Sequence, residues 1–221
     1  MKCAAALLAA AVLGGCAQMQ VLTPVSPLLG TPLSTRARDY DTRRQIAELE
    51  GKGDWQSLSA MAAQVAARDP SNADWLVILG YARLQAADYP QAMDILGKAA
   101  ERSPEDADAR NLHGEALRLS GQTERAVQVL ERSVMSHPNS APGWFLLGEA
   151  YGDSKRLERA RTAFAESVRI EPEYSLGWFG LAGALARVGP REQYELALQR
   201  LKALSPELHE AHIRAVSAQK P

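Results

Sequence analysis

This chain contains very little cysteine and no excess of either charge. Its 221 residues include two cysteines, and its 25 Lys and Arg side chains are balanced by 26 Asp and Glu, for a formal net charge of −1 at pH 7. So few cysteines exclude a disulfide-rich scaffold and a cysteine-ligated zinc module. Because positive charge is not in excess, the basic field needed for nucleic-acid binding is missing, and we expect no nucleic-acid partner.

The motifs of common catalytic sites are also missing. The sequence shows no Gly-rich phosphate loop after a strand pattern, and Leu208-His209-Glu210-Ala211-His212 does not match the H-E-x-x-H zinc motif. His209 and His212 share a helical face, but two imidazoles without a third ligand make a poor metal site, so we expect a solvated surface there. We therefore expect no enzyme, cofactor, metal site or small-molecule substrate. A metal-dependent enzyme using these two histidines is the alternative from another class.

No apolar run is long enough to cross a bilayer. The run from Ala4 to Leu13 follows the basic start Met1-Lys2 and is far shorter than the ~20 residues that a spanning helix needs. A basic start, a short apolar stretch and small residues before a cut are typical of a secretory signal. We therefore predict a cleaved signal over residues 1–15.

The end of this signal, Leu13-Gly14-Gly15-Cys16, is similar to the bacterial lipobox. The resemblance implies that Cys16 becomes the acylated first residue of the mature chain and anchors it to a membrane. An ordinary signal peptide with a chance cysteine is the alternative. Cys3 would leave with the signal, so no disulfide could form within the mature chain. The neutral Ala17 implies, by resemblance to bacterial lipoproteins, an outer-membrane protein that faces the periplasm.

Five prolines follow one another at intervals of 34 residues. A fixed period of this length predicts an array of stacked repeats. Two columns of small residues keep the same period and predict close approach of paired helices, and a turn is expected between them. The prolines are at 70, 104, 138, 172 and 206, and the columns are Gly80, Gly114, Gly148, Ala182 and Ala92, Ala126, Ala160, with Tyr194 as an exception.

These columns resemble the tetratricopeptide repeat (TPR), whose pattern runs W-x2-L-G-x2-Y, then A, F and P. The fourth repeat matches best, with Trp144, Leu147, Gly148, Tyr151, Ala160, Phe164 and Pro172. The resemblance implies an all-α, right-handed solenoid of about five 34-residue helix pairs, with a degenerate first pair around Gly53-Asp54-Trp55. A capping helix over about residues 207–217 should cover the last pair.

Three segments follow from these patterns: the signal over residues 1–15, a lipidated flexible tether over 16–36 and the TPR solenoid over 37–221. The tether contains Pro24, Pro27 and Pro32 but is unusually rich in Leu and Val for a disordered linker. A membrane-proximal linker is one interpretation. An arm that packs on the solenoid or on a partner is the other.

The first helix of each TPR pair lines a concave groove, which the resemblance makes the expected partner-binding surface. The Lys/Asn clamp of chaperone-binding TPR proteins is absent from these columns, and aromatic and acidic residues suit an amphipathic helix or apolar segment with a basic residue. Burial of Phe145 and Phe179 in the core between repeats is the alternative. The groove candidates are Val77, Tyr81, Asn111, Glu115, Phe145, Glu149 and Phe179.

Length, lipobox, proline-containing tether and repeats together most resemble the TadD lipoprotein family of tight-adherence (Tad/Flp) pilus systems. That resemblance implies a pilotin-like role, in which a protein partner, a secretin segment among the candidates, is bound during assembly of an outer-membrane pore. A type IV pilus pilotin and a scaffold for peptidoglycan hydrolases are the alternatives.

Overall fold

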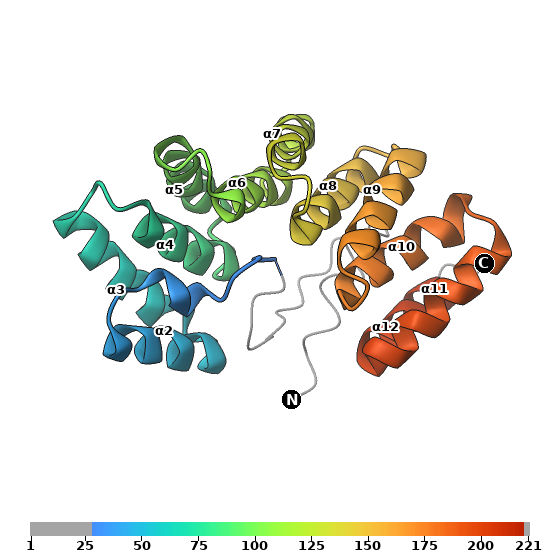
Figure 1. Ribbon diagram of the computed structural model, residues 1–221, viewed down its shortest axis with the longest axis horizontal. Coiled ribbons are helices and arrows are strands. Elements are labelled where there is room, and N and C mark those ends of the chain that lie inside the picture. Colours follow the sequence, from blue (N-terminus) through green and yellow to red (C-terminus); the bar gives the residue numbers. More distant parts are fainter. Residues whose placement is uncertain (1–27, 219–221) are drawn as a thin grey trace. The chain divides into compact units, whose positions relative to one another are not determined.

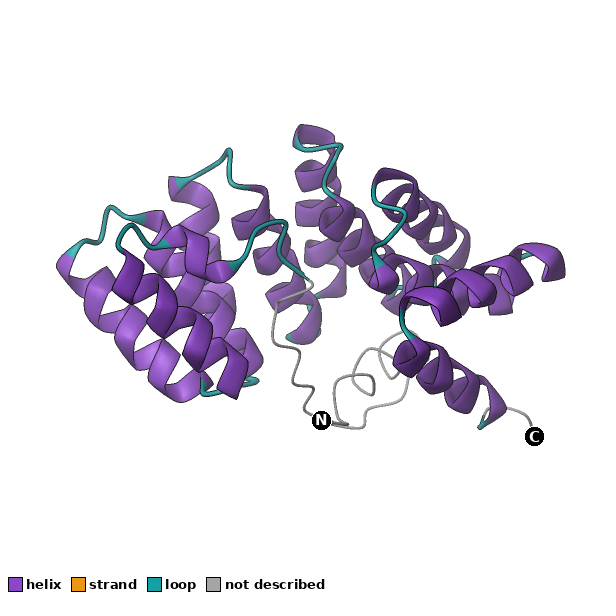
Figure 2. Cartoon of the chain, turned by 60° about the horizontal axis from the view of Figure 1, so that its bottom comes forward, coloured by secondary structure: helices purple, strands orange, loops and turns teal. Residues whose placement is uncertain are grey.

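The computed structural model describes residues 28–218, so the predicted signal and Cys16 lie outside the described residues. Within residues 28–218 the chain consists of helices and connecting loops without a strand (Figure 2). None of these helices combines the length and the apolar character that crossing a bilayer would require. The chain divides into two compact units, with a boundary between Pro138 and Asn139.

The N-terminal unit contains a short 3-10 turn and three antiparallel helix pairs, which follow one another in chain order (Figure 1). The first pair is the degenerate repeat, and its two helices lie on either side of the predicted turn. The elements are η1 (Leu33–Arg36), α2 (Tyr40–Lys52), α3 (Trp55–Arg68), α4 (Ala73–Gln85), α5 (Tyr89–Arg102), α6 (Ala107–Leu119) and α7 (Thr123–Ser136).

The C-terminal unit contains two further helix pairs and the capping helix. In the last connection Ser205 both ends α11 and begins α12, and Pro206 is the first residue of the capping helix. The earlier period prolines instead lie in loops between pairs. The helices are α8 (Ala141–Asp153), α9 (Leu157–Ile170), α10 (Ser175–Val188), α11 (Arg191–Leu204) and α12 (Pro206–Ser217).

The turn inside each of the first four pairs uses one left-handed residue at the same place in the period. Gly53 and Gly121 have φ of 66° and 77°, and Ala87 and Lys155 have φ of 59° and 61°. A non-glycine residue adopts this conformation at some steric cost, so the repeat geometry outweighs local preference at the latter two. The fifth turn differs because the residue before Pro190 is restricted to extended conformations.

The predicted small-residue columns mark the closest approach of paired helices. A Cβ added to Gly80 would lie 2.5 Å from Leu96, and one added to Gly114 would lie 2.5 Å from Leu130. In the C-terminal unit the ring of Phe164 fills the corresponding space, within 2.5 Å of a Cβ built at Gly148. Each glycine therefore makes room for one large apolar side chain of the opposite helix.

The described part of the predicted tether contacts the helices of the N-terminal unit. Residues 28–37, which we call the strap, pack on the N-terminal unit, where Leu29, Leu33 and Ala37 are 8%, 0% and 2% exposed. Arg36 of the strap pairs with Asp106, which caps the start of α6, and with Asp108 of α6. Apolar side chains and a buried ion pair therefore hold residues 28–37 against the helices, as expected of a packed arm.

The glycine column gives a direct test of this packing. Replacing Gly114 by Ala should destabilise the N-terminal unit by about 1–3 kcal/mol, because the new methyl group overlaps Leu130 and the core must shift. The matched control is Gly51→Ala in α2, where an added Cβ meets nothing within 4 Å; it should be neutral or stabilise by about 0.4–1 kcal/mol. Urea denaturation of the two variants measures both effects, and equal stabilities would contradict the assigned packing.

Candidate functional site

The seven groove candidates all lie on the first helix of a pair, as predicted, and all have very low exposure. Their exposed fractions range from 0% to 5%. The candidates are Val77 and Tyr81 on α4, Asn111 and Glu115 on α6, Phe145 and Glu149 on α8, and Phe179 on α10.

The candidates of the N-terminal unit are surrounded by neighbours of the helix array. The ring of Tyr81 lies edge-on to Trp55 at 5.7 Å, and Ser133 donates a hydrogen bond of 2.7 Å to Asn111. Glu115 accepts two hydrogen bonds from Arg118, of 2.7 and 2.8 Å. Reversing the charge of Glu115 would thus break a buried ion pair, so this residue is not a charge that can be changed without affecting the fold.

The two phenylalanines of the C-terminal unit are surrounded by rings of their own unit. Phe145 lies 5.8 Å from Phe164 and 5.9 Å from Tyr174, and Phe179 lies 5.9 Å from His212. Both are at most 2% exposed. These contacts favour the core role that the sequence left open beside the role of binding anchor.

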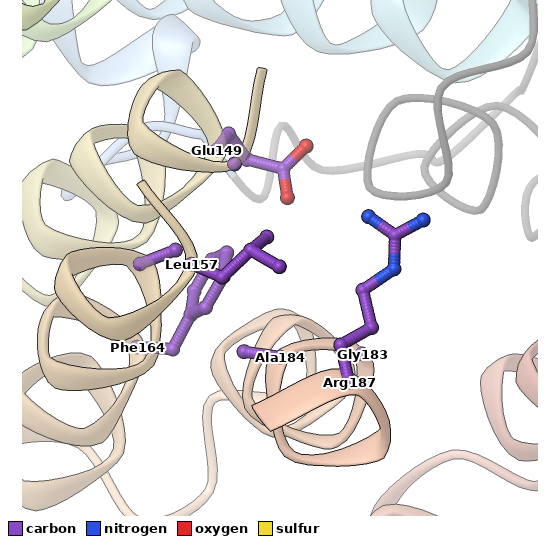
Figure 3. A pocket seen from close by; sticks show the side chains of 8 residues that line it. Glu149, Leu157, Phe164, Gly183, Ala184 and Arg187 are labelled. Atoms are coloured by element: carbon purple, nitrogen blue, oxygen red, sulfur yellow. The ribbon is translucent and has the colours of Figure 1, made fainter. Parts of the chain in front are cut away.

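Glu149 has a different setting, because it borders a hollow between α8, α9 and α10. Its carboxylate and the guanidinium group of Arg187 project over an apolar floor that includes Leu157, Phe164 and Ala184 (Figure 3). Arg187 on α10 is exposed. It lies one turn after Gly183, which also lines the hollow.

This hollow is small and has one exposed charged residue at its border. Its floor is apolar, and the carboxylate of Glu149 at its border is buried, whereas the guanidinium group of Arg187 at the same border belongs to an exposed residue. Its cavity volume of about 10 Å³ holds about one water molecule, so a peptide could lie across its opening but could not insert a side chain. Within residues 28–218, no three His, Cys, Asp or Glu side chains are grouped so that they could hold a metal ion.

The histidines of the capping helix do not form the solvated surface that the sequence predicted. His212 is 2% exposed, and its Nε2 lies 3.1 Å from the hydroxyl of Tyr194 on α11. Burial lowers the pKa of His212 to about 4, and the nearby His209 contributes to the shift. The prediction was wrong for His212 because Tyr194, the exception in the small-residue column, reaches back to the capping helix.

A second cluster, which the sequence did not reveal, lies at the starts of α4 and α6. The guanidinium group of Arg36 is 8% exposed and contacts Asp74, Asp106 and Asp108 at 3.1, 2.6 and 2.9 Å. Burial opposes the charge of Arg36, but hydrogen bonding to Asp106 and the three carboxylates outweigh it and raise the pKa. Burial would also raise the pKa of Asp106, yet the bond and charge of Arg36 lower it.

Asp106 has two structural roles at the start of α6. The structure shows that it both caps α6, by accepting from the amides of Asp108 and Ala109, and binds Arg36 through two hydrogen bonds. A carboxylate at a helix start is favourable by itself. The additional partner, Arg36, lies 70 residues earlier in the chain, so no local sequence pattern predicts this contact.

Comparisons with known proteins identify the type of repeat. A model of the family described as anaphase-promoting complex, cyclosome, subunit 3 matches residues 85–167, and a search of curated proteins found no match. The chain is similar in structure to TTC0263, a thermophilic TPR protein of Thermus thermophilus, with a TM-score of 0.67, 17% identity and coverage of 79% of this chain and 95% of the other.

Two other solved structures are similar over much of the chain. MamA from Desulfovibrio magneticus RS-1 gives a TM-score of 0.57 at 21% identity, covering 81% of this chain and 95% of its own. YrrB, a TPR protein with an unusual peptide-binding site, gives 0.56 at 20%, covering 78% and 88%. At these identities the likeness shows the fold alone. The predicted all-α stack of TPR-type helix pairs is confirmed.

The buried His212 predicts a specific loss of stability in acid. Its folded pKa of about 4 lies below the unfolded value of about 6.5, so the unfolded chain binds the proton more readily. The stabilising contribution should be complete above pH 6.5 and fall by about 2–3 kcal/mol as the pH drops to 4. Urea denaturation across this range measures the loss.

The matched variants for this test are His212→Gln and His209→Gln. The first should flatten the pH dependence between pH 6.5 and 4, since no buried imidazole remains to be protonated. The second should keep most of it, because it leaves the Tyr194–His212 contact intact. If both variants retain the wild-type pH profile, His212 does not control acid stability.

Proposed function

We propose that this chain is a TPR-type adaptor, anchored through Cys16 to the outer membrane and facing the periplasm, that binds a segment of a partner protein. The observation that carries the binding part is the exposed Arg187 beside the small apolar hollow of the C-terminal unit. The peptide-binding site that distinguishes the similar protein YrrB supports the assignment of a peptide or protein ligand.

The anchoring part of the proposal rests on the sequence Leu13-Gly14-Gly15-Cys16 behind a short apolar run. Covalent lipid contributes about 0.8 kcal/mol for each buried CH2 group, and more than one chain is needed for stable attachment. Maturation at a lipobox cysteine, which the resemblance to bacterial lipoproteins implies, supplies several chains. A protein held in this way would present its repeats to partners near the membrane.

The finer proposal is a pilotin-like role in assembly of a Tad/Flp pilus, with a secretin segment as the ligand. It is supported by the resemblance to the TadD family in length, lipobox and repeats. The surface around the hollow suits such a ligand because an apolar segment can cover the half-buried Leu157 while its acidic or polar groups meet the exposed Arg187.

Lipid attachment should depend on Cys16 alone. We expect Cys16→Ser to abolish incorporation of labelled palmitate and to leave an unprocessed or soluble species. Cys3→Ser is the matched control and should label normally, because Cys3 lies within the predicted signal. Metabolic labelling followed by membrane fractionation measures both, and continued labelling of the Cys16 variant would exclude a lipobox.

Partner binding should depend on the charge at the edge of the hollow. Arg187→Glu changes an exposed side chain and should leave the stability unchanged, but it should weaken binding of a secretin segment by about 1–2 kcal/mol and change its salt dependence. Arg200→Glu is the control, since Arg200 is exposed on α11 and does not border the hollow.

Titration of a labelled secretin segment against the purified proteins measures the two affinities. An unchanged affinity for the Arg187 variant would exclude the hollow as the binding site. Loss of binding in both variants would point to a general dependence on net charge instead. If the wild-type protein fails to bind any secretin segment, the finer proposal is lost while the adaptor proposal can still be tested with other partners.

A further inference from the structure

The strap is bound by the N-terminal unit as an extended peptide ligand would be. Its apolar side chains, Leu29 and Leu33, belong to the same buried cluster as Ile78 of α4 and Leu112 of α6. Apart from the single turn η1, which has no side-chain cap at its start, the strap has no regular structure. Side chains of the helices, rather than a helix or sheet of its own, therefore hold it in place.

The polar contacts of the strap converge on three carboxylates, those of Asp74, Asp106 and Asp108. The backbone amide of Gly30 donates to Asp108 at 2.8 Å, and the hydroxyl of Thr31 donates to the same carboxylate at 3.0 Å. Arg36 contacts all three carboxylates. A side chain at position 30 would crowd this arrangement, since a Cβ there would lie 3.3 Å from Asp108 Oδ1.

Two features show that the strap does not balance every charge and hydrogen-bonding group of this site. One guanidinium group faces three carboxylates, so the charges of these ion pairs leave two negative charges in excess. In addition, Nε of Arg36 is buried and has no hydrogen-bond partner. A buried donor without a partner is unfavourable, so the strap is an imperfect ligand for the site.

We propose that the carboxylates of Asp74, Asp106 and Asp108, with the apolar pockets beside them, form a second binding site, for an extended partner segment with two leucines four residues apart and an arginine three residues later. The strap fills this site in cis, through Leu29, Leu33 and Arg36. A partner segment of the same pattern but with greater positive charge displaces it. This site is separate from the hollow near Glu149 and does not depend on the proposed function.

The covalent connection makes the strap a strong competitor. Only Arg38 and Asp39 join it to α2, and Arg43 of α2 donates to the carbonyl of Ala37 at 2.7 Å. Short connections give effective concentrations of about millimolar or higher. A free copy of the strap at micromolar concentration should therefore not bind the wild-type chain. It should bind once the strap in cis has been weakened.

This competition is tested with a fluorescent peptide of residues 28–38 and two full-length proteins. In the strap variant, Leu33→Asp and Arg36→Ala together remove the apolar and ionic contacts of the strap while leaving the carboxylates intact. We expect saturable binding of the peptide to the strap variant, followed by fluorescence anisotropy, and none to the wild type at the same micromolar concentrations. Higher salt should weaken the binding.

Peptide and site variants identify the contacts that matter. A peptide carrying Arg36→Ala should bind the strap variant about 10- to 100-fold more weakly, the range expected for lost charged hydrogen bonds. A peptide carrying Arg38→Ala is the control, because Arg38 is exposed, and it should bind nearly unchanged. Adding Asp106→Asn and Asp108→Asn to the strap variant should abolish binding, although asparagine still caps a helix.

A folded strap variant that does not bind the peptide would overturn the proposal and reduce the strap to a structural element. An equal affinity of the Arg36 and Arg38 peptide variants would overturn it as well. Light scattering tests a further outcome. A wild-type protein that is dimeric and a strap variant that is monomeric would show that the strap fills the site of a second copy, which contradicts binding in cis.

If the strap variant fails to fold, the wild-type chain provides the test. Millimolar peptide with a second arginine in place of Thr35 should accelerate hydrogen exchange at the amide of Gly30, because its bond to Asp108 opens when the strap leaves. Exchange in α9, which lies in the other unit, should not change. Protection of Gly30 that is insensitive to saturating peptide would exclude a displaceable strap.

Discussion

The contact between a glycine on one helix and a large apolar side chain on its partner is the constraint on which each unit depends. Gly80, Gly114 and Gly148 admit Leu96, Leu130 and Phe164 so closely that a single methyl group would overlap them. Because the paired helices approach at these points, the first helix of a pair is covered on most of its sides. In α4 and α8, residues on every face are buried.

Because the first helices are so deeply buried, few of their side chains are available to contact a ligand. Side chains in the middle of the first helices contact other parts of the array, as Tyr81, Asn111 and Phe145 do. Polar groups that face open space are left at the ends and edges of helices. Arg187 near the end of α10 is one, and Asp74 in the first turn of α4, with its side chain 49% exposed, is another.

The repeat period predicted the fold well because every repeat must solve the same packing problem. It placed the turns correctly even at Ala87 and Lys155, where no glycine supplies the left-handed residue. The period predicted that Glu115 and Phe179 lie on the first helix of a pair, but it did not predict which side chains contact them. A period shows which residues share a helix face and gives no information about the side chain opposite. Arg118 and His212 complete those surroundings.

Contacts outside the period could not be predicted in the same way. The strap and Tyr194 both depart from the repeat pattern, and both make contacts that no local rule describes: Arg36 with Asp106, 70 residues later, and Tyr194 with His212. A signal was nevertheless present in each case. The segment around Leu29 and Leu33 was too apolar for a linker, and Tyr194 stood where other repeats have alanine.

Docking of the strap also connects its site to the proposed lipid anchor. Leu28 lies 28 − 16 = 12 residues after Cys16, whereas Ala37 lies 37 − 16 = 21 residues after it. At full extension these lengths span at most about 43 Å and 76 Å. A ligand that displaces the strap would thus add about 30 Å to the greatest distance between anchor and helices. The reverse effect follows from thermodynamic linkage. Holding the helices far from the membrane would favour the undocked strap, and this would increase the affinity for a ligand that binds in its place.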